Sequence, residues 1–226
     1  METIVSARTD PLWVSVEGVE CSGKSSLTEF LARRVRGVRV VPEFSESAVG
    51  RHLISQVGDA PHHISHSPLG QSLLFLADHA DLAEMAFEWR HSEPGIVLQD
   101  RGYLSKFVYQ LLVLQGSMGT QRAARLLDTL MSHIPRPDVT ILLDSDFSTI
   151  LGRFDDSGRG RPSRDDQEFI REAGRVFRSE LSRLPTLEGT RRIRIFQEPG
   201  DGISKIAARV ANEVPALSWG TPEGVE

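Results

Sequence analysis

The sequence predicts an α/β fold of three layers, in which a parallel five-stranded sheet carries helices on both faces. Short apolar runs alternate with longer segments whose apolar residues recur every three or four positions, which is the pattern of parallel strands joined by crossover helices. The first apolar run leads into a glycine-rich loop, and a helical pattern follows that loop directly. With 226 residues, the chain is long enough for one such domain and short for two, so we expect a single domain over residues 1–226.

The expected strands and helices alternate along the chain. Residues 1–11 are expected to form a flexible leader and residues 218–226 a frayed tail. Strands are expected at 13–17, 38–41, 96–99, 139–143 and 193–196. Helices are expected from the glycine-rich loop to about residue 36, and then over 47–57, from 68 to beyond 87, over 105–115 and 120–133, from a cap at Ser148, and over 165–183 and 203–214.

The glycine-rich loop at residues 18–25 reads G-x-x-x-x-G-K-S, which is the phosphate-loop motif. Its glycines let backbone N–H groups turn towards phosphate oxygens, and the N-terminus of the following helix adds partial positive charge. A chance glycine loop is the alternative, but the strand before the motif and the helix after it argue against that reading. We therefore expect a P-loop NTPase fold that binds a nucleoside triphosphate, ATP or GTP, through Gly18, Val19, Glu20, Cys21, Ser22, Gly23, Lys24, Ser25 and Ser26.

Composition narrows the class of protein further. Apolar residues make up 39% and charged residues 25% of the chain, as in ordinary globular proteins. A net charge of −5 argues against a broad surface for nucleic acid, so no nucleic-acid partner is expected. No apolar run is long enough to cross a membrane, and no signal peptide is evident. The single cysteine, Cys21, excludes an intrachain disulfide, so we expect a cytoplasmic enzyme.

Asp100 and Arg101 follow a buried strand, at the place where P-loop proteins carry a second carboxylate related to Mg²⁺. Asp100 is expected to hold the metal together with Ser25, while Arg101 binds the phosphate of an acceptor in bidentate fashion. The alternative is an Asp–Arg pair that only ties the strand to the next helix.

Arginines in a polar, glycine-rich segment at about 155–164 suggest a mobile lid. Arg159, Arg161 and Arg164 would neutralise charge on a transferring phosphate and exclude water, and Arg153 lies just before them. The alternative is a solvated loop, which is the usual structure of a run of charges.

The sequence leaves more than one interpretation for the roles of several other residues. Glu20 is a carboxylate inside a phosphate-binding loop, which is costly unless it meets a metal, an arginine or a substrate hydroxyl. Phe75 is either a core residue or a residue that stacks on a base. The group His62, His63 and His66 matches no strong zinc pattern, and its role stays open.

Together these residues resemble the thymidylate kinase family of P-loop nucleoside-monophosphate kinases. The family pattern E-G-x-[DE]-x-x-G-K-[ST] matches residues 17–25, and its Phe…Ala-Asp helix is similar to residues 75–80. The family's Asp-Arg, Ser and Tyr-Gln spacing matches Asp100, Arg101, Ser105, Tyr109 and Gln110. A Pro-Asp-(apolar)-Leu-Asp strand matches residues 137–144, and Glu43 with Gly50 is similar to a further family stretch.

The resemblance implies γ-phosphoryl transfer from ATP and Mg²⁺ to a nucleoside monophosphate, dTMP or a close relative, in a homodimer. It implies catalytic roles for Lys24, Arg101, Arg159, Arg161 and Arg164. Ser25 and Asp100 would hold the metal. The acceptor would be bound by Glu20, Glu43, Phe75, His79, Arg101, Ser105, Lys106, Tyr109 and Gln110.

The chain departs from the family where the base should be read. His79 stands where the family usually has an arginine that contacts thymine, and Lys106 stands where a small or amide residue is usual. Gly102 replaces an aromatic residue, and Pro42 replaces an arginine. Two alternatives therefore stay open: a kinase of the same fold that acts on another nucleotide, a nucleoside or a small metabolite, and a regulatory protein that binds nucleotide without transferring phosphate.

Overall fold

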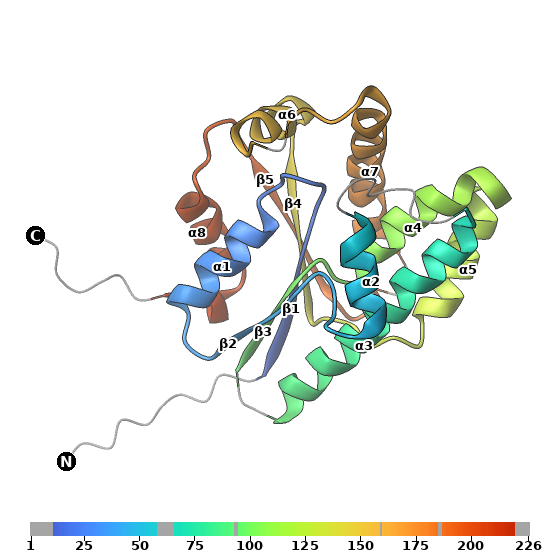
Figure 1. The fold of residues 1–226 in the computed structure, drawn as a ribbon. Coiled ribbons are helices and arrows are strands. Elements are labelled where there is room, and N and C mark those ends of the chain that lie inside the picture. Colours follow the sequence, from blue (N-terminus) through green and yellow to red (C-terminus); the bar gives the residue numbers. More distant parts are fainter. Residues whose placement is uncertain (1–10, 58–65, 93–94, 159, 185–186, 220–226) are drawn as a thin grey trace, which may run out of the picture.

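A computed structural model describes residues 11–57, 66–92, 95–158, 160–184 and 187–219. Its centre is a parallel sheet of five strands in the order β2-β3-β1-β4-β5 (Figure 1). The strands are β1 (Leu12–Glu17), β2 (Val38–Val41), β3 (Ile96–Asp100), β4 (Val139–Ser145) and β5 (Arg191–Gln197). All five predicted strands are confirmed, and most are one to three residues longer than the sequence pattern indicated.

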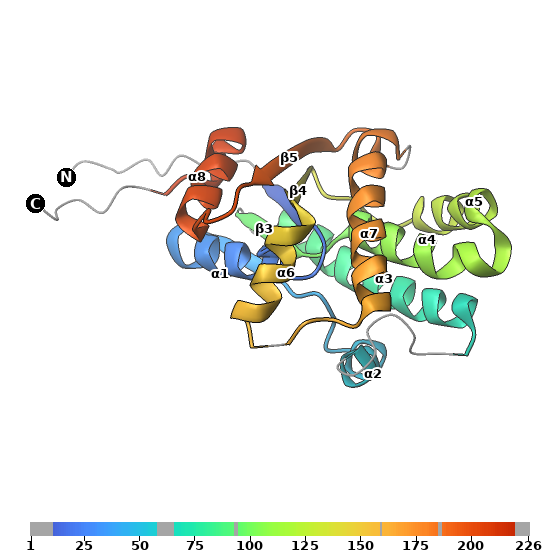
Figure 2. The same ribbon diagram turned by 90° about the horizontal axis from the view of Figure 1, so that it is seen from above.

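Helices cover both faces of the sheet, as the sequence predicted. The helix α1 (Lys24–Arg34) packs with α8 (Ile203–Glu213) on one face, and α3 (Pro68–Ser92), α4 (Tyr103–Met118) and α7 (Arg164–Arg183) cover the other (Figures 1 and 2). The helix α5 (Thr120–Met131) packs on α4. Two further helices, α2 (Ala48–Val57) and α6 (Phe147–Asp156), lie near the carboxyl ends of the strands.

The two faces of the sheet form separate apolar cores because successive strand side chains point to opposite sides. Val14 and Val16 of β1 join the core under α1 and α8, whereas Trp13 packs towards α3. The Trp13 indole Nε1–H donates to the Gln99 side chain at 3.1 Å, so this buried ring keeps a hydrogen-bond partner. No helix in the described ranges is long and apolar enough to cross a membrane.

The ends of several elements differ from the prediction. The helix α6 is capped at Asp146 and not at Ser148, because the Ile150 N–H already donates to the Asp146 carbonyl at 3.2 Å. The helix α4 begins at Tyr103, two residues earlier than expected. The expected leader and tail fall largely outside the described residues. Within the described part, Trp219 packs edge-on against Phe30 at 5.3 Å between ring centroids.

Candidate active site

The phosphate loop, residues 18–25, joins the carboxyl end of β1 to the start of α1. Gly18 has φ +144°, and a Cβ there would lie 2.6 Å from the Leu143 carbonyl oxygen, so no other residue fits. Gly23 has φ +88°, and Cys21 also lies in the left-handed region with φ 55°. These turns fold the loop over the N-terminus of α1, where backbone N–H groups are available to an anion.

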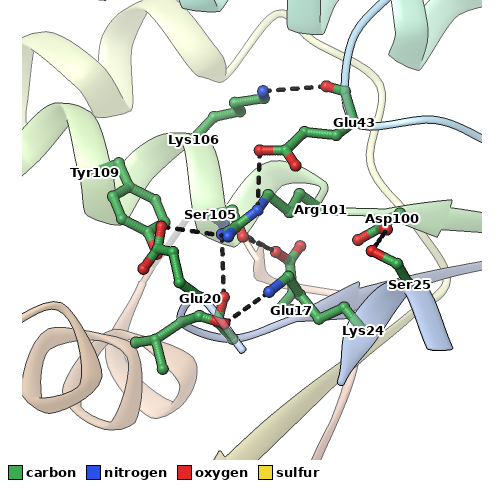
Figure 3. Close-up of polar contacts among 12 residues, drawn as sticks. Glu17, Glu20, Lys24, Ser25, Glu43, Asp100, Arg101, Ser105, Lys106 and Tyr109 are labelled. Atoms are coloured by element: carbon green, nitrogen blue, oxygen red, sulfur yellow. Dashed lines mark hydrogen bonds and ion pairs between the residues drawn. The ribbon is translucent and has the colours of Figure 1, made fainter. Parts of the chain in front are cut away.

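Lys24 and Ser25 begin α1 and face the carboxyl edge of the sheet (Figure 3). The Lys24 ammonium donates to the Val19 carbonyl at 2.7 Å and to the Ser22 hydroxyl at 3.4 Å. Burial, and then the charge of Arg101, lower the pKa of Lys24 to about 8. The Ser25 hydroxyl donates to Asp100 Oδ2 at 2.6 Å, a contact that is possible because β1 and β3 are neighbouring strands.

A cavity of about 470 Å³ adjoins the phosphate loop, and we call it the donor cavity. The cavity is lined by residues of the loop, by Arg101, by the end of α6 and by the start of α8. Arg153 lines this cavity, and one of its N–H groups donates to the Cys21 carbonyl at 3.4 Å. The lining residues that the sequence did not single out are Asp156, Ser157, Gln197, Asp201, Ile203 and Ile206. Gln197 could have been found from its place at the end of a predicted strand.

Arg101 connects the phosphate loop to two acidic residues (Figure 3). Its Nη1 donates to the Gly18 carbonyl at 3.1 Å, Nη2 lies 3.3 Å from Glu20, and Nε lies 2.9 Å from Glu43. Burial by itself would lower the pKa of the Arg101 guanidinium, but the carboxylates, Glu43 foremost, raise that pKa well above its ordinary value. The charge of Glu20 inside the phosphate loop is therefore compensated by Arg101, one of the kinds of partner expected for it from the sequence.

A second, narrower cavity of about 60 Å³ lies on the other side of Arg101, and we call it the acceptor cavity. Glu20, Glu43 and Arg101 line both cavities, so the two spaces meet at these three side chains. The remaining lining residues are Phe44, Gln71, Phe75, Ser105, Lys106, Tyr109, Gln110, Val113 and Phe169. An aromatic slot therefore opens beside a cluster of charged groups.

Side chains around the acceptor cavity hold one another in place. The Tyr109 hydroxyl donates to Glu20 Oε2 at 2.9 Å, and its ring stacks on Phe169 at 5.9 Å between centroids. Burial, and beyond it the negative charge of Glu20, raise the pKa of Tyr109 well above its usual value, so it stays a hydroxyl donor. Burial would raise the pKa of Glu43, but Arg101 and other nearby cations lower it below its usual value.

Glu17 lies beneath the site and fixes the start of α4. It accepts hydrogen bonds from the backbone N–H groups of Gly102 and Ser105, both at 3.0 Å, and from the Ser105 hydroxyl. These bonds satisfy N–H groups that the first turn of a helix leaves without partners, which is why α4 begins early. A Cβ on Gly102 would lie 2.8 Å from Ser15 Cβ, so no room is left here for an aromatic residue.

The structure brings together all but one of the predicted acceptor residues. Phe75 lines the cavity and lies 6.1 Å from Phe44 between ring centroids. His79 does not line either cavity, since it is fully buried with its ring 6.1 Å from Tyr103. Burial, with the charge of Lys106, lowers the pKa of His79 to about 3, so it is neutral at physiological pH. Phe75 and His79 are four positions apart on α3, so they lie on one face of that helix, but only Phe75 reaches the cavity.

Two of the arginines predicted for a lid, Arg161 and Arg164, line neither cavity. Arg161 pairs with Asp155 at 2.8 Å and is 64% exposed, and Arg164 is 90% exposed at the first turn of α7. Arg159 lies outside the described residues, as do His62 and His63. His66 is exposed, and among the described residues no cluster of His, Cys, Asp and Glu side chains could hold a metal by itself.

Comparison with known proteins gives a consistent result. The family model for thymidylate kinase matches residues 16–198. A probable thymidylate kinase from Pyrobaculum aerophilum is 30% identical over 182 residues, which are 80% of this chain and 89% of that protein. A probable thymidylate kinase from Methanosphaera stadtmanae is 26% identical over 148 residues, which are 64% of this chain and 72% of that protein.

Solved structures share the fold at lower sequence identity. The thymidylate kinase of Candida albicans aligns with a TM-score of 0.67 at 17% identity, covering 94% of this chain and 96% of that one. The thymidylate kinase of Ehrlichia chaffeensis aligns with a TM-score of 0.63 at 19% identity, covering 90% of this chain and 98% of that one.

Proposed function

Because the chain belongs to the thymidylate kinase family, we propose that it transfers the γ-phosphoryl group of ATP to dTMP and forms dTDP. The observation that carries this proposal is the meeting of two cavities at Glu20, Glu43 and Arg101. One cavity adjoins a phosphate loop, and the other is a narrow aromatic slot. A donor phosphate and an acceptor phosphate bound in these spaces would meet beside the Arg101 guanidinium.

On the donor side, Lys24 and the N–H groups of the phosphate loop would bind the β- and γ-phosphates of ATP. The Lys24 ammonium would leave the Val19 carbonyl, which it contacts at 2.7 Å, for the more strongly charged phosphate oxygens. Arg153 also lines the donor cavity, where its guanidinium is available to the nucleotide.

Ser25 and Asp100 have the chemistry of a Mg²⁺ site. Within the described residues, Asp100 Oδ1 is buried without a hydrogen-bond partner, and Oδ2 accepts only from the Ser25 hydroxyl. Mg²⁺ is commonly held by one or two carboxylates together with substrate phosphates and water, so this donor set fits. When bound, Mg²⁺ would supply positive charge to the β- and γ-phosphate oxygens.

On the acceptor side, Arg101 presents a guanidinium that matches a phosphate in bidentate fashion. Its present partners, Glu20 and Glu43, hold it in place until the acceptor phosphate arrives. The base would lie between the Phe44 and Phe75 rings and the Tyr109 side of the cavity. No general base is required, because a phosphate monoester is already anionic near neutral pH.

We further propose that the segment between α6 and α7 closes over the bound nucleotides. Arg159, Arg161 and Arg164 would then stabilise charge on the transferring group and exclude water. The bidentate pair of Arg161 with Asp155 would open during closure, at little energetic cost since both side chains are solvent-exposed.

A homodimer in the cytoplasm, without nucleic acid, completes the proposal. Four apolar side chains on α2 and α3 are between 41% and 55% exposed, and a second copy of the chain would cover some of them. They are Ile54, Leu69, Leu73 and Phe87. Light scattering after size exclusion would test the dimer, and a monomer at micromolar concentration would contradict it.

An ADP-release assay with ATP, Mg²⁺ and a panel of nucleoside monophosphates and nucleosides tests the proposed reaction. Turnover fastest with dTMP supports it, whereas turnover only with another acceptor favours a different kinase of the same fold. Tight ATP binding with no acceptor-dependent ADP would indicate a regulatory protein. Lys24→Ala should lower turnover by roughly 10³-fold, whereas Arg33→Ala, a change to an exposed side chain on the same helix, should leave it unchanged.

A further inference from the structure

Lys106 places an ammonium group against the aromatic wall of the acceptor cavity. Its Nζ lies 4.8 Å from the centroid of the Phe44 ring and 5.5 Å from that of Phe75. The residue is 4% exposed and stands in the first turn of α4. Both its burial and its position near the positive end of a helix are unfavourable for a cation.

The Lys106 ammonium has more N–H donors than it has hydrogen-bond acceptors around it. Within the described part of the chain it has a single hydrogen-bond acceptor, the Glu43 carbonyl oxygen at 3.3 Å. An ammonium carries three N–H donors and no acceptor. Burial lowers the pKa of Lys106, while the charges of Glu43 and Asp78 oppose that shift. A ligand in the cavity therefore meets a group that can only donate a hydrogen bond while it stays charged.

Gln110 supplies a hydrogen-bond acceptor to the same cavity. It is 2% exposed, and its Oε1 has no partner among the described residues. Gln110 follows Lys106 by four positions on α4, so the two side chains lie on one face of the helix and both line the cavity. A donor and an acceptor side by side suit a base edge on which a carbonyl oxygen adjoins an N–H group.

We propose that Lys106 reads the base of the acceptor and selects pyrimidine nucleotides with a 4-oxo group over those with a 4-amino group. This inference rests on the proposed function. Thymine and uracil present O4 to the ammonium and N3–H to Gln110 Oε1. Cytosine presents an amino group and an unprotonated N3. Its amino group and the Lys106 ammonium are both hydrogen-bond donors, so they cannot bond to each other. The Gln110 amide can turn to suit either base, and Lys106 therefore carries the discrimination.

His79 cannot take this role. It lies outside the acceptor cavity, and neither of its ring nitrogens has a hydrogen-bond partner among the described residues. Its lowered pKa, about 3, leaves it uncharged at physiological pH. The cation available to the base thus comes from α4 and not from α3.

The test compares dUMP with dCMP, because their bases differ only at the 4-position and its neighbouring nitrogen, and includes dTMP as the proposed substrate. For the wild-type protein we expect kcat/KM for dUMP to exceed that for dCMP by about 10- to 100-fold, the worth of one charged hydrogen bond. Lys106→Met, which keeps chain length and apolar contact, should bring this ratio close to one. Lys106→Arg, which keeps the donors, should retain the preference for dUMP.

Lys205→Met is the matched control, since it makes the same change at an exposed lysine on α8 and should leave the dUMP to dCMP ratio unaltered. Calorimetric binding of dUMP and dCMP gives a readout that does not need turnover. If Lys106→Met does not fold, Lys106→Gln, whose amide can donate or accept, should accept both bases and serves in its place. The inference fails if the wild-type protein uses dTMP but does not distinguish dUMP from dCMP, or if the preference survives removal of the ammonium. Absence of turnover with all three nucleotides would overturn the proposed function itself, and the inference with it.

Discussion

The affinity for ATP should fall as the pH rises from about 7 to about 9.5, because Lys24 loses its proton in that range. In the free protein, burial and then the nearby Arg101 lower the pKa of this ammonium to about 8, against the contributions of Asp100, Glu20 and Glu43, which raise it. Bound phosphates would favour the charged form and raise the pKa again. ATP binding is therefore coupled to uptake of a proton above about pH 8.

The size of the effect follows from the pKa of Lys24. At about pH 9, one unit above that pKa, only about one-tenth of the free protein carries the proton, so the Kd for ATP should be about tenfold weaker than near pH 7. The ATP phosphates themselves are already ionised over this range and contribute little. The stability of the free protein against unfolding should instead increase as the pH rises. Burying a charged Lys24 destabilises the folded protein fully below about pH 8, and this cost disappears as the pH approaches 10.5, the pKa of the lysine in the unfolded chain.

Isothermal titration with ATP in the absence of an acceptor, in two buffers of different ionisation enthalpy, measures both the Kd and the proton uptake. Lys24→Met is the control, and its weak binding should be independent of pH. A wild-type Kd that is constant from about pH 7 to about pH 9.5, or a pH dependence that persists in Lys24→Met, would refute the reasoning.

Two substitutions probe the packing of the site. Gly50→Ala should lower the free energy of unfolding by about 1–3 kcal/mol or more, because its Cβ would collide with the Ser45 carbonyl; chemical denaturation measures this, and an unchanged midpoint would contradict it. Tyr109→Phe removes the hydroxyl that donates to Glu20 and should lower kcat/KM for dTMP by about three- to tenfold, while the Kd for ATP stays the same; equal losses for both nucleotides would show that Tyr109 does not act on the acceptor side.

The sequence by itself determined the fold class and the place of the phosphate loop between the first strand and the first helix. Strands and helices could be read from periodicity because each buries one face or one stripe of its own residues. The phosphate loop could be read because it binds through consecutive backbone N–H groups, which a short motif specifies completely. Gly18 and Lys24 accordingly lie in the structure where the motif predicted.

The acceptor half depended on tertiary structure, because its walls come from segments far apart in the chain. The pairing of Arg101 with Glu20 and Glu43 joins three loops that no local pattern relates. Helical spacing could show that Phe75 and His79 lie on one face of α3. It could not show that Phe75 lines the cavity while His79 is buried in the core. Only the packing of α3 against α4 decided that His79 is buried in the core and that Lys106 lines the acceptor cavity.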